Sequence, residues 1–362
     1  MKKETQLNGY LLFRANTKSE FIVESGTNQV SRSFSGGDIS GADGESDKDR
    51  LCFFGKREDC FQLQALAKVS AFFSISQVEM ARLTVKLLKL APPYTIALDR
   101  TEWQLGTRWV NVLMLSINYR QMAIPLFWTV LETKGCCDDA EKQAMMAQFL
   151  EEFPADSIRF VSADREFASK EWLQYLVASK IGFRLRIKAN VRITDKRGQL
   201  VRASKMCRTL KTGERMEFRR RRRLWGQTVF VAVCRKADGD NVIVISSEQS
   251  ARILLEYGER WRIETLFGNL KTRGFRLEDT HLTDSARVSK LLSLLTLAGC
   301  WALLAGEFES TETPIKIKKH GRAEKSVFRL GFETLRNCFC RIQLNLEQKQ
   351  RFQELMLLLS CT

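Results

Sequence analysis

Short apolar runs alternate with segments of helical periodicity along the middle of the chain. The apolar runs predict strands at residues 94–99, 109–119, 123–133, 159–164 and 182–188. Helical spacing predicts helices at 138–153 and 170–179. The first of these helices opens at Asp138 and Asp139, which are both candidate N-cap residues. This strand-strand-strand-helix-strand-helix order predicts a layered α/β domain.

The next part of the chain changes from short strands to helices. Residues 189–246 are interpreted as β-rich, with strands at residues 199–202, 217–223, 228–234 and 242–246 and with turns that contain glycine at residues 196–198 and 238–240. Helical spacing then predicts helices at residues 248–272, 291–306, 327–342 and 347–359. The apolar stretch 291–306 is too short, and too often interrupted by Ser, Thr and Gly, to span a membrane. We therefore expect it to be a buried helix.

The N-terminal part of the chain has weaker patterns. Residues 36–49 are rich in Ser, Gly and acids, which is typical of a flexible linker. Residues 61–91 have helical periodicity that ends at Pro92-Pro93. We expect an atypical or poorly ordered region at residues 1–60, followed by a short helical segment at 61–92.

Four polar residues share one face of the predicted helix 248–272. Tyr257, Arg260, Glu264 and Lys271 are three, four and seven residues apart. At 100° per residue they fall within a stripe roughly 60° wide that runs along about four turns. One carboxylate therefore lies among groups that bind phosphate, as a nuclease or a strand-transfer enzyme requires.

Two further carboxylates are candidates for the same site. Asp99 and Asp164 each end a short apolar run that we interpret as a buried strand. An acid at the end of a buried strand is usually paired or bound to a metal ion, although Asp also caps turns. Together with Glu264 they form a set of hard oxygen ligands that suits Mg²⁺ or Mn²⁺. Two such ions would hold the attacking and leaving oxygens of a phosphodiester.

Charge is concentrated in one part of the chain. The net charge is +16, and residues 184–225 contain 16 Lys and Arg against three acids. Such a segment favours a polyanionic partner over a merely basic soluble protein. Five consecutive arginines occur within it, at Arg219, Arg220, Arg221, Arg222 and Arg223. Because burying unpaired arginines is costly, we expect both faces of this strand to meet solvent or DNA, and a solvated edge strand is the alternative.

The cysteine and histidine content excludes several kinds of site. The chain has ten Cys and two His, and no Cys-x-x-Cys pair, so a zinc site is not expected. The scarcity of His also argues against a Ser-His-Asp or Cys-His hydrolase. No signal peptide is evident, so we expect free thiols in a reducing cytoplasm and no membrane partner.

Several motifs together resemble a known family. They are Leu98–Trp103, Ala163–Phe167, and the helix face from Tyr257 to Lys271, which continues to His281. The chain is similar to the bacterial DDE transposases of insertion sequence family four, which are marked by Tyr-x2-Arg-x3-Glu-x6-Lys. The likeness runs from about residue 96 to about residue 336. The first sixty residues depart from the helical DNA-binding domain that the family usually carries there.

The resemblance implies a ribonuclease-H-like α/β catalytic domain at residues 93–188 and 247–306. A β-rich insertion at 189–246 would interrupt this domain, and a basic linker and C-terminal helices would occupy 307–362. It also implies Mg²⁺-dependent cleavage at terminal inverted repeats and strand transfer into target DNA. The enzyme would use two ions and would act as a homodimer in a paired-end complex.

The resemblance assigns roles to particular residues. Asp99, Asp164 and Glu264 would be the catalytic metal ligands, and Tyr257, Arg260 and Lys271 would bind DNA near the scissile bond. In relatives that proceed through a DNA hairpin, an aromatic residue of the insertion stacks on a flipped base. Trp225 is a candidate for that role, and a core tryptophan is the alternative. Two other functions remain open, namely a DNA-binding derivative without catalysis and a ribonuclease-H-like nuclease.

Overall fold

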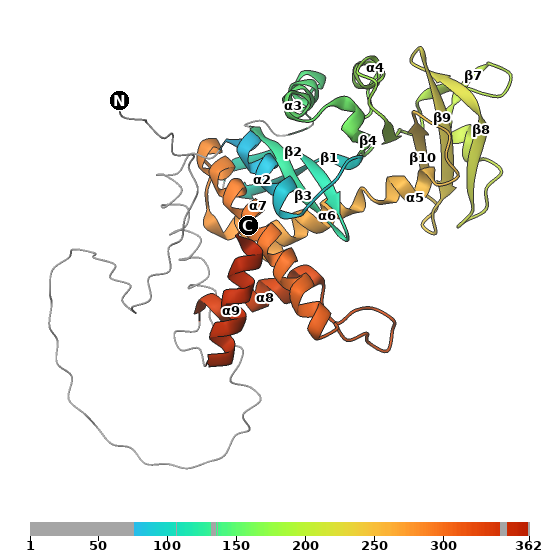
Figure 1. Cartoon of the computed structure of the whole chain (residues 1–362). Coiled ribbons are helices and arrows are strands. Elements are labelled where there is room, and N and C mark those ends of the chain that lie inside the picture. The colour runs from blue at the N-terminus through green and yellow to red at the C-terminus, as the bar shows by residue number, and fades with distance from the viewer. Residues whose placement is uncertain (1–75, 106, 132–134, 136, 341–345, 361–362) are drawn as a thin grey trace, which may run out of the picture. The chain divides into compact units, whose positions relative to one another are not determined.

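The computed structural model describes residues 76–360 except 106, 132–134, 136 and 341–345. The expected linker at 36–49, the region 1–60, most of the helical segment 61–92 and the ends of the predicted elements 123–133 and 327–342 lie outside these residues. The fold is mixed α/β with one large mixed sheet, which is consistent with the expected ribonuclease-H-like domain (Figure 1).

The central sheet begins with an antiparallel meander of three strands. These are β1 (Tyr94–Leu105), β2 (Arg108–Tyr119) and β3 (Met122–Leu131). Strand β4 (Ile158–Ala163) then pairs parallel with β1, and β5 (Phe183–Arg186) pairs parallel with β4. The order β3-β2-β1-β4-β5 therefore places the ends of β4 and β5 beside the middle of β1.

The predicted β-rich segment extends this sheet. Strands β10 (Asn241–Ser246), β9 (Gln227–Arg235) and β8 (Arg215–Leu224) follow β5 in that order, so the described sheet has eight strands. We expected this segment to interrupt the domain, and the structure joins it to β5 through three antiparallel pairs. A separate two-stranded sheet contains β6 (Arg192–Thr194), which the sequence patterns missed, and β7 (Leu200–Arg202).

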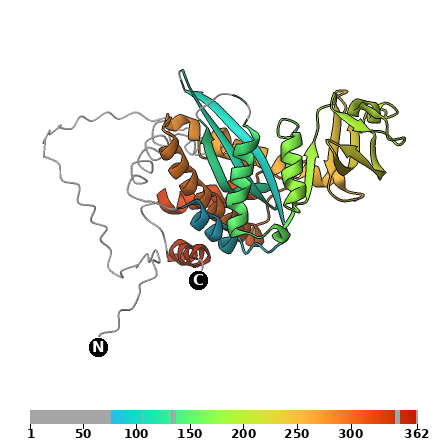
Figure 2. The same ribbon diagram turned by 90° about the horizontal axis from the view of Figure 1, so that it is seen from above.

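Helices cover the first part of the sheet. Helices α3 (Asp139–Glu152) and α4 (Lys170–Ala178) lie on one side of it, and α6 (Trp261–Gly268) and α7 (Ser285–Glu312) lie on the other (Figures 1 and 2). Helix α2 (Gln77–Leu87) packs against β3 and α7. The carboxylate of Asp138 accepts a hydrogen bond from the Glu141 amide, so the predicted cap is confirmed.

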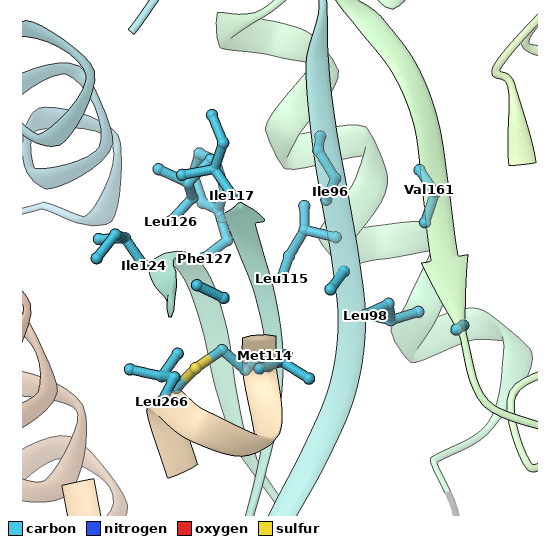
Figure 3. Close-up of a cluster of buried hydrophobic side chains, with 14 of the residues drawn as sticks. Ile96, Leu98, Met114, Leu115, Ile117, Ile124, Leu126, Phe127, Val161 and Leu266 are labelled. Atoms are coloured by element: carbon cyan, nitrogen blue, oxygen red, sulfur yellow. The ribbon is translucent and has the colours of Figure 1, made fainter. Parts of the chain in front are cut away.

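The core is built where strand and helix faces meet. Strand β2 is buried over its middle eight residues because both of its faces are covered. Figure 3 shows side chains of β1 to β4 packed together with a residue of α6, and they include Ile96, Met114, Phe127, Val161 and Leu266. This core holds the strands that carry the candidate carboxylates.

Helix α7 is the buried helix expected at residues 291–306. Within the described part of the chain it is the one helix long and apolar enough to cross a membrane, and 61% of its most apolar window is buried inside the fold. Its buried residues include Leu291, Leu295, Ala302 and Leu303. Its apolar character is thus used in packing against protein.

The predicted helix 248–272 is divided into three segments. They are α5 (Ile253–Gly258), α6, and a π-helical turn at Asn269–Arg273. At the joint, the amides of Glu259 and Arg260 bond three residues back, to the carbonyls of Glu256 and Tyr257. The hydrogen bonds at this joint span three residues, and those of the π-helical turn span five, so both places change the rotation per residue. A regular spacing of 100° therefore does not hold over the whole segment.

The remaining elements form the C-terminal part and short connections. Helices α8 (Val327–Cys340) and α9 (Leu346–Leu359) agree with the predicted ones. Short 3₁₀ turns occur at Ala155–Ser157, Ala203–Cys207 and Leu277–Thr280. The described free cysteines include Cys137, Cys207 and Cys234, as expected of reduced thiols.

Candidate active site

The two candidate aspartates lie on neighbouring parallel strands. Leu98 of β1 is paired with Ala163 of β4, so Asp99 and Asp164 are the next residues along the two strands. Asp164 follows the end of β4, as predicted. Asp99 was expected at a strand end, and this was wrong, because β1 continues through it to Leu105 while pairing with β2.

Arg260 joins two of the three carboxylates. Its Nη1 atom lies 2.5 Å from Oδ2 of Asp99 and 3.4 Å from Oε1 of Glu264. Arg260 and Asp99 are only 5% and 6% exposed, whereas the Glu264 side chain is 41% exposed. The Arg260 guanidinium therefore pairs with the buried Asp99 and also contacts the half-exposed Glu264.

Asp164 has partners from two elements. The hydroxyl of Tyr257 donates to Oδ1 of Asp164 at 3.1 Å. Arg186, the last residue of β5, places Nη1 3.5 Å from the same oxygen. Nη2 of Arg186 lies 2.6 Å from Asp240, in the turn between β9 and β10. Tyr257, Arg260 and Glu264 thus converge with Asp99 and Asp164, as the shared helix face predicted.

Two residues beside the acids were missed by the sequence reasoning. Arg186 belongs to a predicted strand, but nothing in its pattern indicated that parallel pairing of β4 and β5 would place it beside Asp164. Trp261 is 67% exposed, and the Arg260 guanidinium lies 5.7 Å from its ring centroid. The signal available in the sequence was the tryptophan directly after Arg260.

Burial and nearby charge determine the protonation of the acids. Burial raises the pKa of Asp99 to about 7, against the charge of Arg260 and the Arg100 amide, which lower it. Burial would also raise the pKa of Asp164. The Arg165 amide, Arg260, Arg186 and the Tyr257 hydroxyl outweigh this effect, so that pKa is lowered. Burial raises the pKa of Tyr257, which keeps its hydroxyl protonated as a donor.

A buried ion-pair network holds α5 behind these residues. Arg184 is fully buried, and its Nε and Nη2 atoms lie 2.7 Å from Glu256 and 2.7 Å from Glu248. The second oxygen of Glu256 is 2.8 Å from Arg159 of β4. Because Glu256 precedes Tyr257, the network fixes the position of α5 relative to β4 and β5.

Lys271 does not join the acids. Its Nζ donates to the carbonyl oxygen of Glu102 at 2.5 Å and lies 3.4 Å from the Glu278 carboxylate. It also lies 5.6 Å from the centroid of the Trp103 ring. The change in helical rotation after Gly268 thus directs Lys271 to the part of β1 beyond Asp99.

The donor set fits a divalent cation in its chemistry. Two aspartates and one glutamate offer hard oxygen ligands, and the raised pKa of the buried Asp99 marks a carboxylate that an added positive charge would stabilise. The described residues contain no ready-made group of three such ligands, since Arg260 lies between Asp99 and Glu264.

The arginine run of β8 is only partly available to a partner. The pairing of β8 with β9 is irregular between Phe218 and Arg222, so the strand bulges there. Arg222 is buried and donates to the carbonyl oxygens of Arg220 and Arg221, while its guanidinium lies over Phe218. Our expectation that the whole run meets solvent was therefore wrong for Arg222. The exposed arginines are Arg219, Arg220, Arg221 and Arg223.

Trp225 occupies the turn between β8 and β9. Trp225 and Gly226 have φ values of +50° and +82°, as a two-residue type I′ hairpin turn requires. Leu224 and Gln227 pair on either side of this turn. The Trp225 side chain is half-buried and packs against the core, so the core interpretation has support and the stacking role stays a prediction.

The burial difference within the arginine run yields a prediction. Replacing the four exposed arginines with Ser should weaken duplex binding and flatten its salt dependence, by about 0.9 in logarithmic slope for each phosphate that is no longer neutralised. The Arg222→Ser variant should instead lower the melting temperature and leave the slope unchanged. Affinity measured at several salt concentrations checks both variants. If the salt dependence changes only in the Arg222→Ser variant, the four exposed arginines are not the duplex contact.

Comparison with known proteins gives one family match. Residues 91–301 match the family model described as the transposase DDE domain. No curated protein matches the chain. Among solved structures it is similar to a piggyBac transposase synaptic complex with hairpin DNA, at 11% identity and a TM-score of 0.39. The likeness covers 73% of this chain and 58% of that chain, which is less than two thirds of the piggyBac protein.

Proposed function

The chain belongs to the transposase DDE domain family, whose members catalyse phosphoryl transfer in DNA transposition, and from this premise we propose a cut-and-paste transposase of the Tyr-Arg-Glu-Lys group (insertion sequence family four). One observation carries the proposal. Asp99 and Asp164 lie side by side on β1 and β4, and Glu264 faces them across Arg260. Asp99 and Glu264 pair with the Arg260 guanidinium, and the charge of Arg260 also lowers the pKa of Asp164, so the three acids gather around one cation.

Asp99, Asp164 and Glu264 would hold two Mg²⁺ ions, for which Mn²⁺ can substitute. When bound, the ions would stabilise the attacking and leaving oxygens of the phosphodiester. The first cut uses water as the nucleophile and releases a 3′-OH group. That hydroxyl then attacks a phosphodiester of the target DNA and displaces its 3′ oxygen.

The chain's own groups position the reacting parts. Tyr257 holds Asp164 through its hydroxyl, and the Arg184–Glu256 network holds Tyr257 in place. Arg260 leaves the acids and donates to phosphate oxygens when DNA arrives, since a planar guanidinium suits two oxygens at once. Lys271 contributes a point charge at the neighbouring surface. Most of the rate enhancement then comes from positioning and electrostatics.

The DNA partners follow from the same proposal. The exposed arginines of β8 would contact the duplex at the terminal inverted repeats, and Trp225 would stack on a flipped base if the ends pass through hairpins. Two copies of the chain would act on two ends in one complex. We also propose that the protein acts in the bacterial cytoplasm, at the nucleoid.

Two experiments test this function. Inverted repeats flanking the gene, with a short target duplication outside them, would support it strongly. Purified protein incubated with those ends and Mg²⁺ should give both cleaved ends and joined products. Cleaved ends without joined products favour a ribonuclease-H-like nuclease. Binding without any cleavage favours a DNA-binding derivative that has lost catalysis.

Arg260 provides a sharper prediction about phosphate binding. Arg260→Ala should weaken assembly of the paired-end complex by about ten- to a hundredfold, because hydrogen bonds to charged groups each contribute roughly 1.5–3 kcal/mol. Arg260→Lys should restore little of it, since an ammonium cannot form a two-pronged contact. Gel-shift assembly on nicked and intact ends measures the effect.

Arg262→Ala is the matched control, because Arg262 lies on the same helix and pairs with Glu259 at 3.0 Å, away from the three acids. It should assemble normally. If Arg260→Ala assembles as well as this control yet loses affinity for Mg²⁺, the phosphate role of Arg260 is wrong.

A further inference from the structure

The connection between α7 and α8 forms an ordered β-hairpin. Ile317 and Ala323 form an antiparallel bridge. The Lys318 amide donates to the Arg322 carbonyl at 2.8 Å, and the Glu324 amide donates to the Lys316 carbonyl at 2.8 Å. Gly321, with φ at +78°, closes the turn. Residues 316–324 are called the basic hairpin below, and Figure 1 shows this orange loop extending away from the helices.

The two ends of the basic hairpin lead into helices α7 and α8, which pack closely against each other. A side chain added at Gly306 would meet the Val327 carbonyl oxygen at 2.0 Å, and one at Gly331 would meet that of Ala302 at 1.8 Å. Helices α7 and α8 therefore touch backbone to backbone on either side of the hairpin. The two ends of the hairpin are therefore held close to each other by helix packing.

The start of α8, directly after the hairpin, contacts the segment that follows Lys271. Phe328 of α8 packs edge-on against Phe275, with ring centroids 5.8 Å apart. Arg329 donates to the carbonyl oxygen of Arg273 at 3.3 Å. The hairpin is thus attached beside the end of the segment that carries Glu264 and Lys271.

The charge of the hairpin is unbalanced. Lys316, Lys318, Lys319 and Arg322 are all exposed, and no acid among the described residues forms an ion pair with any of them. The single acid of the hairpin is Glu324, and the nearby Lys325 is occupied by Glu333 at 2.8 Å. Four such cations on a fixed ribbon repel one another, and a polyanion relieves this repulsion.

We propose that the basic hairpin is a second duplex-DNA surface, separate from the β8 arginines, which binds the phosphate backbone without reading sequence. A two-stranded ribbon fits against a DNA groove, and lysines bind phosphates as point charges. An acidic protein would satisfy the same charges. DNA is favoured because the inference rests on the proposed function, which requires the chain to hold an element end and target DNA together.

The test compares two variants of the full-length chain with the same loss of charge. The hairpin variant is Lys316→Gln, Lys318→Gln, Lys319→Gln and Arg322→Gln. The control is Lys86→Gln, Lys89→Gln, Lys170→Gln and Lys180→Gln, all cations at the ends of α2 and α4. Binding to a random-sequence duplex and to a duplex bearing the element end is measured at several salt concentrations. Equal melting temperatures verify that both variants fold.

The hairpin variant should flatten the logarithmic salt slope by about two to four on both duplexes, and the control by less than about one. Equal slopes for the two variants would overturn the proposal, and so would an effect seen only on the element end, because the contact would then read sequence. Mg²⁺-dependent cleavage is measured separately on wild-type protein. If cleavage is absent while the slopes still differ, the proposed function fails and the hairpin surface stands.

Discussion

Asp99→Ala, Asp164→Ala and Glu264→Ala should each reduce Mg²⁺-dependent cleavage by more than about a thousandfold. Loss of one ligand removes several kcal/mol of charge stabilisation, and each 1.36 kcal/mol is about tenfold in rate. DNA binding should change little, because the exposed arginines of β8 that we propose as the duplex contact lie on a different element from the three acids. Cleavage of a labelled duplex and a parallel gel shift provide the two measurements.

The three variants should differ in stability. Asp99→Ala leaves Arg260 buried without its closest partner, so its melting temperature should fall below that of Glu264→Ala, whose side chain is half-exposed. Glu259→Ala is the control, because Glu259 lies on the same helical stretch and pairs with Arg262 at the surface. Normal cleavage in any one of the three variants removes that residue from the site.

Glu256→Ala should lower the free energy of unfolding by about 3–5 kcal/mol. Removal of this carboxylate leaves Arg184 fully buried with only the exposed Glu248 as an ionic partner among the described residues. It also frees Arg159 and loosens α5, which carries Tyr257. Urea-induced unfolding followed by circular dichroism measures the change.

Glu309→Ala is the comparison for this variant. Glu309 forms a two-pronged pair with Arg351 at 3.1 and 2.7 Å, and the arginine side chain is 41% exposed. Its loss should cost about 1 kcal/mol or less. A Glu256→Ala variant as stable as Glu309→Ala would show that the buried network contributes little. If Glu256→Ala is stable but forms the paired-end complex poorly, Glu256 acts only by positioning α5 and Tyr257.

Much of the fold could be predicted from local pattern. The predicted ranges of strands β2 to β5 and of the helices α3, α4, α8 and α9 lie close to the observed bounds, whereas β1 begins as predicted and continues six residues further. Their apolar spacing and caps are local properties of the chain. Asp164 at the end of β4 was predicted for the same reason. The three acids were selected by their motifs together, since none of them was distinctive alone.

Other features depend on contacts between residues far apart in sequence. Asp99 lies inside β1 because β2 pairs with the strand beyond it, and Arg186 reaches Asp164 only through the parallel register of β4 and β5. The bulge of β8 decides that Arg222 is buried, although its neighbours in sequence have the same side chain. The pattern of residues within one strand does not show which other strand will pair with it.

The amino-acid sequence by itself therefore determined the order of strands and helices, the family resemblance and the three candidate acids. The tertiary structure decided which cation neutralises which acid, which arginines remain exposed, and where Lys271 points. The physical reason is the range of the interactions involved. Helical and strand periodicity act over a few residues, whereas burial and ion pairing depend on which elements pack together.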